Sequence, residues 1–151
     1  VAQGVVDVAV WEQIRETALA LFDLGSRELL TRGLLFVDTK YEFGLYRGSL
    51  MLADEIHTLD CSRFWVGGSY EDNLSSGRAP EMLDKEPVRR WLMEQGFQGE
   101  GPVPNVSDDY RMHLRGYYRD SAERITGRGF QFDDHDPALR VETNLRRYLG
   151  Y

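Results

Sequence analysis

The sequence predicts an α+β domain in which a small antiparallel or mixed sheet is flanked by helices. One helical pattern comes first along the chain, followed by three short strand patterns, a long loop and three further helical patterns. Strands and helices that are segregated in this way favour an α+β fold over an alternating α/β fold. The length of 151 residues and the 42% hydrophobic content predict one domain over residues 1–151.

The first segment, about residues 10–31, is predicted to form an amphipathic helix. Its apolar residues recur at helical spacing, namely Trp11, Ile14, Ala18, Leu21 and Phe22. Gly25 weakens this pattern because glycine disfavours a helix interior, and Gly33 marks the expected end. The apolar run 34–37 then predicts a buried strand.

Two further strand patterns, 41–46 and 49–54, predict a β-hairpin. Arg47 and Gly48 lie between them, and glycine can take the positive φ that a tight turn needs. Residues 66–83 are then rich in Gly, Ser and Asn, which predicts a long, poorly packed loop.

Start and stop residues predict three helices in the last part of the chain. Pro87 suits the first turn of a helix that ends near Gln95. Ser107 is a predicted cap for a helix over 108–126, which Gly127 ends. Asp136 and Pro137 predict the start of a final helix that runs to about residue 149.

The composition excludes several classes of protein. The net charge of −7 argues against a broad surface for nucleic acid or anionic membrane. Cys61 is the only cysteine, which excludes an internal disulfide and a multi-cysteine zinc site and fits a reducing cytoplasm. No apolar run approaches the roughly 20 residues of a membrane-spanning helix. We therefore expect a cytoplasmic protein without a nucleic-acid or membrane partner.

Lysine is rare in this chain, and both lysines lie close to aspartates. The sequence has two lysines, Lys40 and Lys85, against sixteen arginines. An ammonium group is a compact point charge that suits a phosphate oxygen or a reacting carboxylate. The acids and cations between Asp38 and Trp65 therefore indicate a site for an anionic, metal-bound substrate.

The spacing of the charged residues suggests where such a site would form. Asp38, Lys40 and Glu42 have the period of two that places side chains on one face of a strand, with Asp54 expected on the neighbouring strand. Glu42 and Asp54 could then supply carboxylate oxygens to Mg²⁺, while Lys40 neutralises phosphate oxygens. The alternative is a solvated strand face whose ion pairs contribute only a few tenths of a kcal/mol.

Further cations are candidates for gripping a phosphate or carboxylate. Ser62-Arg63 follows a strand, and Arg89-Arg90 lies early in a predicted helix. An arginine fork can bind such a group through two parallel hydrogen bonds, although a surface arginine with no ligand is the alternative. The sequence contains no P-loop and no dinucleotide-binding glycine motif, so most of a nucleotide site would have to come from elsewhere.

Several motifs together resemble one enzyme family over most of the chain. They are Asp38–Gly44, Leu52–Glu55, Asp60–Trp65, Asp84-Lys85 with Arg89, and the stretch Tyr110–Gly127. In this order and spacing they resemble the C-terminal portion of phosphoribosylaminoimidazole-succinocarboxamide synthase, the SAICAR synthetase family. Leu59 stands where that family usually has proline, and Cys61 stands where serine or glycine is usual.

The resemblance implies a ligase of purine biosynthesis that joins L-aspartate to carboxyaminoimidazole ribotide at the expense of ATP. The resemblance also implies that Lys40 and Asp38 are catalytic residues and that Glu42 and Asp54 bind Mg²⁺. The implied substrate-binding residues are Asp60, Ser62, Arg63, Lys85 and Arg89.

The family also has an N-terminal ATP-binding domain, which the resemblance implies is absent from residues 1–151. The isolated chain is then expected to be inactive, and a homo-oligomer is possible. The alternative is a non-catalytic module derived from the same family that binds the ribotide or a nucleotide.

Overall fold

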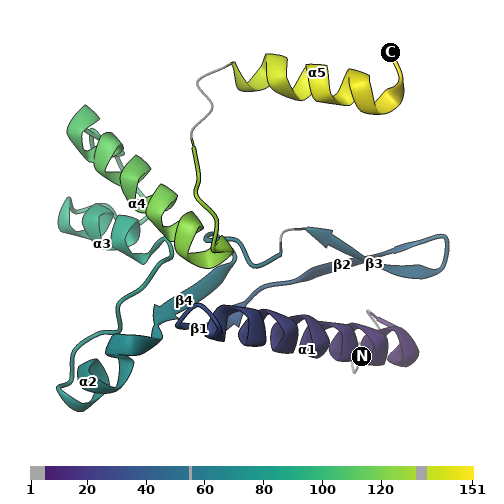
Figure 1. Cartoon of the computed structure of the whole chain (residues 1–151), viewed down its shortest axis with the longest axis horizontal. Helices are drawn as coiled ribbons and strands as arrows, with labels where there is room; N and C mark the ends of the chain where they lie inside the picture. Colours follow the sequence, from purple (N-terminus) through teal and green to yellow (C-terminus); the bar gives the residue numbers. More distant parts are fainter. Residues whose placement is uncertain (1–5, 55, 132–135) are drawn as a thin grey trace.

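The computed structural model describes residues 6–54, 56–131 and 136–151 and confirms the α+β class (Figure 1). The helices in this part of the chain are α1 (Val8–Leu30), the short 3-10 helix η1 (Gly67–Ser69), α2 (Tyr70–Ser75), α3 (Glu86–Glu94), α4 (Asp108–Thr126) and α5 (Pro137–Leu149). The strands are β1 (Leu34–Thr39), β2 (Glu42–Tyr46), β3 (Ser49–Asp54) and β4 (Ser62–Val66).

The strands form two separate antiparallel pairs instead of one sheet. β2 pairs with β3 as the predicted hairpin, and β1 pairs with β4. The pattern analysis missed β4, because its serine and arginine obscure the short apolar segment that follows. This fourth strand matters for function because its register places Asp38 opposite Arg63.

The β2–β3 hairpin turns at Arg47 and Gly48, as predicted. Their φ angles are 51° and 80°, the two positive values that a two-residue hairpin turn of type I′ requires. The hairpin runs alongside α1 (Figure 1), and its first and last residues, Glu42 and Asp54, are partners across the strands.

A small core lies where the C-terminal half of α1 meets the β1–β4 pair. Its buried apolar residues are Leu29, Leu34, Phe36, Phe64 and Leu83. Gly25 is also buried in this contact, and a Cβ atom there would lie 2.7 Å from His57 Cε1 and 3.1 Å from Phe36 Cε1. The glycine therefore does not interrupt α1. It lets the helix approach the strands.

The predicted start and stop residues of the later helices are confirmed. Ser107 Oγ accepts a hydrogen bond from the Tyr110 backbone N–H at 3.2 Å, and Gly127 ends α4 with a φ of 67°. Asp136 Oδ1 likewise accepts from the Ala138 N–H at 2.9 Å at the start of α5. Each cap satisfies a backbone group that the helix itself leaves unpaired.

The prediction of a loop over residues 66–83 is wrong in part. η1 and α2 lie within it, and its last residues run antiparallel to β4. Val66 N–H donates to Glu81 O at 2.9 Å, and Leu83 N–H donates to Phe64 O at 3.0 Å. The middle of the segment remains mostly exposed, as its polar composition predicts.

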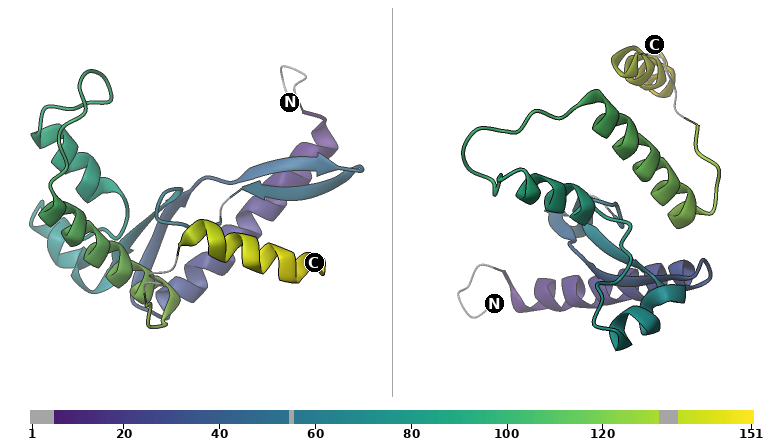
Figure 2. Two further views of the ribbon diagram at one scale, coloured as in Figure 1. Left: turned by 90° about the horizontal axis from the view of Figure 1, so that it is seen from above. Right: turned by 90° about the vertical axis from the view of Figure 1, so that its left-hand side faces the viewer.

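The helices after β4 lie at three separate places, and η1 and α2 lie apart from the others (Figure 1). α3 and α4 lie side by side (Figure 2), and the rings of Trp91 and Tyr110 stack between them with centroids 4.2 Å apart. α5 stands apart from the other helices in Figure 1 and in the right-hand view of Figure 2, and it contributes no buried residue. None of the helices in the described ranges has the length and apolar character needed to cross a membrane.

Candidate functional site

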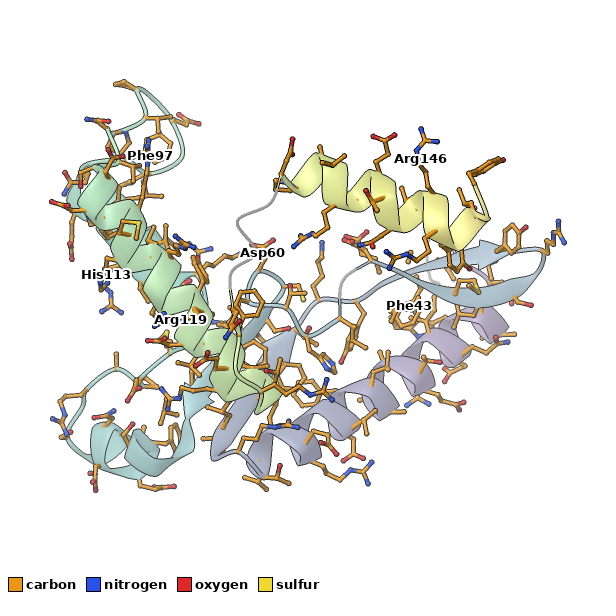
Figure 3. All side chains as sticks on the ribbon, turned by 45° about the horizontal axis from the view of Figure 1, so that its top comes forward. Phe43, Asp60, Phe97, His113, Arg119 and Arg146 are labelled. Carbon is orange, nitrogen blue, oxygen red and sulfur yellow. The ribbon has the colours of Figure 1, made fainter. Side chains whose placement is uncertain are left out.

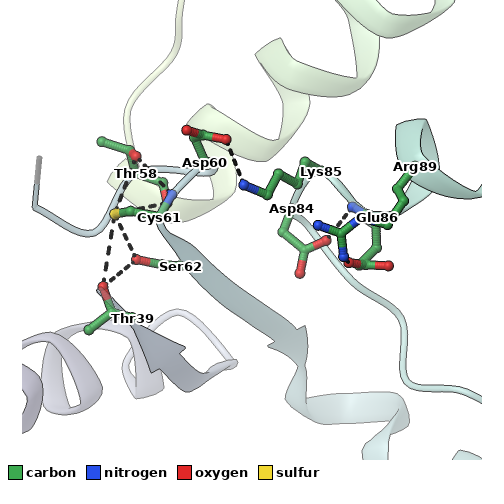
Figure 4. A network of polar contacts seen from close by, with 9 residues as sticks. All are labelled: Thr39, Thr58, Asp60, Cys61, Ser62, Asp84, Lys85, Glu86 and Arg89. Atoms are coloured by element: carbon green, nitrogen blue, oxygen red, sulfur yellow. Dashed lines mark hydrogen bonds and ion pairs between the residues drawn. The ribbon is translucent and has the colours of Figure 1, made fainter. Parts of the chain in front are cut away.

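A polar cavity of about 270 Å³ opens where β1, β4 and the start of α3 meet. Six of the residues predicted for the site line it, namely Asp38, Asp60, Ser62, Arg63, Lys85 and Arg89. Cys61, Asp84 and Glu86 complete the lining, and Figure 4 shows most of this group. Residues that are 51 positions apart along the chain therefore converge on one cavity, which we call the Arg63 cavity.

Arg63 is held in place by Asp38 across the β1–β4 pair. Arg63 Nε donates to Asp38 Oδ1 at 2.9 Å and to Oδ2 at 3.0 Å, and Nη2 donates to the same carboxylate. These hydrogen bonds from the guanidinium hold the pKa of Asp38 below its usual value. The Asp38 carboxylate binds one edge of the planar Arg63 guanidinium and so fixes the direction in which the remaining N–H groups of Arg63 point.

Ser62 lines the Arg63 cavity but faces the other side of β4. Its side chain is buried, and its hydroxyl lies 2.8 Å from Thr39 Oγ1 and 3.3 Å from Cys61 Sγ. Alternation along the strand sends Arg63 to the solvent side and Ser62 and Phe64 to the core side. The hydroxyl is thus engaged on the core side of β4, whereas Arg63 and its partner Asp38 meet on the solvent side.

The other two cations of the Arg63 cavity are also paired with acids. Lys85 Nζ lies 2.8 Å from Asp60 Oδ1, and this ion pair holds the pKa of Asp60 below its usual value. Arg89 forms an ion pair with Glu86 one turn earlier on α3. An anionic ligand must therefore share or displace these carboxylates when it binds.

Lys40 lies next to the Arg63 cavity, and the structure corrects its predicted relation to Asp38 and Glu42. β1 ends at Thr39 and β2 begins at Glu42, so the three charged residues do not share one strand. The chain changes from one strand pair to the other at Lys40, whose backbone N–H donates to Cys61 O at 3.0 Å. Its Nζ reaches Glu42 Oε1 at 2.5 Å, which brings Lys40 to the predicted metal ligands.

Glu42 and Asp54 are adjacent, as the hairpin predicted. They are partners across β2 and β3, and both are exposed. Among the described residues, no group of three or more His, Cys, Asp or Glu side chains is arranged to hold a metal ion. Two neighbouring carboxylates nevertheless fit Mg²⁺, which binds hard oxygen ligands and retains several waters or phosphate oxygens.

Asp84 lines the Arg63 cavity, and no role was predicted for it although it belongs to one of the motifs of the resemblance. Its Oδ1 accepts a hydrogen bond from the Glu86 N–H at 2.8 Å, and Tyr117 O–H donates to its backbone carbonyl at 2.9 Å. Only 1% of the residue is exposed, and burial raises the pKa of its carboxyl group. An aspartate two residues before a helix start is a capping signal that could have located it.

The second oxygen of Asp84 is unusual. Oδ2 is buried, and no hydrogen-bond donor for it is present in the described part of the chain. Buried polar atoms in proteins nearly always have a partner, so an exception of this kind calls for an explanation.

A larger and more apolar cavity of about 580 Å³ adjoins the Arg63 cavity. Lys85 and Arg89 line both cavities, and the rest of its lining includes Val88, Leu92, Phe97 and Tyr118. Figure 3 shows Phe97 at the end of the α3–α4 pair that is farthest from the strands. Its lining lies within residues 85–99 except for Tyr118 of α4, and no motif of the sequence predicted it.

The fold and the Arg63 cavity thus define an α+β protein in which charged side chains cluster around one cavity. The family model described as SAICAR synthetase matches residues 1–104. The phosphoribosylaminoimidazole-succinocarboxamide synthase of Bacteroides fragilis is 40% identical over 152 residues, covering 99% of this chain and 48% of that protein. The chain therefore belongs to the SAICAR synthetase family, and it spans about half the length of the curated relatives it matches.

Solved structures of this family resemble the chain in fold. The SAICAR synthase from Saccharomyces cerevisiae complexed with SAICAR has a TM-score of 0.67 and 28% identity, covering 82% of this chain and 40% of that one. A SAICAR synthetase in complex with ADP has a TM-score of 0.57 and 27% identity, covering 84% of this chain and 42% of that one.

Proposed function

We propose that this chain carries the magnesium- and ribotide-binding half of a SAICAR synthetase site. The reaction joins L-aspartate to carboxyaminoimidazole ribotide and converts ATP to ADP and phosphate. The convergence of the predicted substrate-binding residues on the Arg63 cavity carries this proposal. Family membership and the relatives solved with SAICAR and with ADP support it.

The charges of the site suit this chemistry. A carboxylate is a poor acyl donor, so it first takes the γ-phosphoryl group of ATP: a C–O–P linkage forms and ADP leaves. The amine of L-aspartate then attacks the acyl carbon, which forms the C–N bond, releases phosphate and frees a proton. Phosphoryl transfer of this kind is catalysed mostly by positioning and charge neutralisation.

In this proposal the cations of the Arg63 cavity bind the anionic groups of the ribotide. Arg63, Lys85 and Arg89 supply the charge, while Asp38 and Asp60 orient Arg63 and Lys85 through the ion pairs described above. Ser62 contributes to the cavity wall.

Lys40 would neutralise the transferring phosphoryl group, because it lies between this cavity and Glu42. Glu42 and Asp54 would hold Mg²⁺, which when bound offsets the charge of phosphate oxygens.

We propose further that the chain by itself binds the ribotide but does not complete the reaction, because it spans about half the length of its relatives. The second candidate is a module that binds the ribotide and has no catalytic role in any assembly. The two differ in whether the chain becomes active when it is supplied with the remaining half of a relative.

Calorimetric titration of the chain with carboxyaminoimidazole ribotide tests the proposal. We expect binding that weakens as salt is raised, because charge pairing dominates the contact and salt screens it. Product formation measured in parallel with ATP, Mg²⁺ and L-aspartate should be absent. Steady product formation by the chain alone would contradict the half-site proposal, and absence of ribotide binding would contradict the assignment of the Arg63 cavity.

A further inference from the structure

Asp84 differs from the other acids of the Arg63 cavity because, in the described part of the chain, no ion pair holds its carboxylate, although Arg63 and Arg89 lie near enough to act on its charge. Asp38 pairs with Arg63, Asp60 with Lys85 and Glu86 with Arg89. Asp84 uses Oδ1 to accept the Glu86 N–H, and its Oδ2 is buried without a partner in the described part of the chain. The cavity wall therefore holds one carboxylate oxygen whose hydrogen-bonding capacity is unused, and because this oxygen is buried a ligand reaches it only when the side chains around it move.

The position of Asp84 is fixed by the strands and by α4. Met82 is the bridge partner of Trp65, so Asp84 continues this antiparallel pairing to the position beside Arg63. The Tyr117 hydroxyl holds the same segment by donating to Met82 O at 3.1 Å and to Asp84 O at 2.9 Å. The carboxylate is thus anchored on both sides and cannot readily turn out to water.

We propose that Asp84 accepts the ammonium group of the amino-acid substrate. The inference rests on the proposed function, in which the amine of L-aspartate must approach the carboxylate of a ribotide bound in this cavity. An ammonium group supplies the missing hydrogen bond and places a positive charge in direct contact with the carboxylate, whereas a hydroxyl supplies only the hydrogen bond.

The surroundings of Asp84 suit an amino dicarboxylate. Lys85 and Arg89 are half-exposed beside it, and each is held by one acid. Each of these cations carries several N–H donors, so Lys85 and Arg89 can contact the ribotide and the carboxylates of the amino acid together, in place of Asp60 and Glu86. The release of Asp60 and Glu86 also moves the side chains that flank Asp84. Cations for the two carboxylates and an acid for the amine then lie within one cavity.

Two ligands that differ mainly in the amine test this assignment. The chain is titrated with L-aspartate and with succinate, which keeps both carboxylates and lacks the amine, with ribotide present at a fixed concentration. We expect the wild type to bind L-aspartate about tenfold or more tightly than succinate, as one charged hydrogen bond in a buried site predicts. Equal binding of the two ligands by the wild type would overturn the proposal.

Asp84→Asn is the decisive variant, because asparagine keeps the shape and the acceptor for the Glu86 N–H. We expect it to lose most of the preference for L-aspartate, while the matched variant Asp120→Asn, at an exposed acid of α4 that does not line the cavity, keeps the wild-type ratio. A ratio that is unchanged in Asp84→Asn would show that the residue acts only on the fold. Ribotide binding without any amine preference would overturn this inference alone, whereas loss of ribotide binding in the wild type would overturn the proposed function as well.

Discussion

At the scale of single residues, the acids of the Arg63 cavity fall into two kinds. The cation beside Asp38 lowers the pKa of its carboxyl group, so its ion pair stabilises the fold above the usual carboxyl pKa and is lost as the pH falls. The pKa of Asp84 is shifted in the opposite direction, because burial raises it. Its ionised form costs stability once the pH has risen above the usual carboxyl range, which is a known cost of functional sites.

Asp84→Asn should therefore stabilise the chain at neutral pH. Removing the buried, unpaired charge should raise the free energy of unfolding by about 1 kcal/mol and the melting temperature by about 2–4 °C. The gain should disappear as the pH falls below about 4, where aspartate is protonated in the unfolded chain as well. Thermal denaturation across this pH range measures both effects.

Asp120→Asn is the control for this prediction. It makes the same chemical change at an exposed acid, and its melting temperature at neutral pH should stay close to that of the wild type. A lower melting temperature for Asp84→Asn at neutral pH would show that the ionised carboxylate has a stabilising partner.

At the scale of elements, the sequence predicted the helices better than the strand pairing. The caps at Ser107 and Gly127 are local signals, and α4 begins and ends where they predict. β4 depends on a partner 23 or more positions earlier, and neither its serine nor its arginine indicates a strand. The shared face expected for Asp38, Lys40 and Glu42 failed for the same reason, because a simple period of two does not reveal that the chain changes strand pairs at Lys40.

The close contact of α1 with the strands at Gly25 predicts how a substitution there changes the stability of the chain. Gly25→Ala should destabilise the chain by about 1–3 kcal/mol, because the new methyl group overpacks against His57 and Phe36. Gly116→Ala in α4 is the matched control, since in the described part of the chain no atom beyond the neighbouring residues and backbone of its own helix lies within 4 Å of its Cβ position, and it should stabilise the chain by about 1 kcal/mol. Chemical denaturation of both variants measures the difference, and equal effects would contradict the close packing at Gly25.

At the scale of the whole molecule, the buried core is small and lies at one end of α1. Many large apolar side chains of the described residues are exposed, including Leu145, Tyr148 and Leu149 on α5. The Arg63 cavity is built from β1, β4 and the start of α3, so α5 contributes nothing to it. The site and the core are therefore expected to be independent of the last helix.

Deletion of residues 136–151 tests this independence. The shortened chain should keep its melting temperature and its affinity for the ribotide within error, because α5 has no buried residue and no side chain in the Arg63 cavity. Thermal denaturation and ribotide titration measure the two properties. A clear fall in either one would show that α5 supports the fold or the site.

The most direct measurement of the central claim is the affinity of the chain for carboxyaminoimidazole ribotide with and without Arg63. Calorimetry should show that Arg63→Ala weakens binding by about 1.5–3 kcal/mol, the range for a hydrogen bond to a charged group. Arg27→Ala, which removes an exposed arginine paired with Asp23 on α1, should bind like the wild type. Unchanged affinity in Arg63→Ala, or an equal loss in both variants, would contradict the assignment of the Arg63 cavity as the ribotide site.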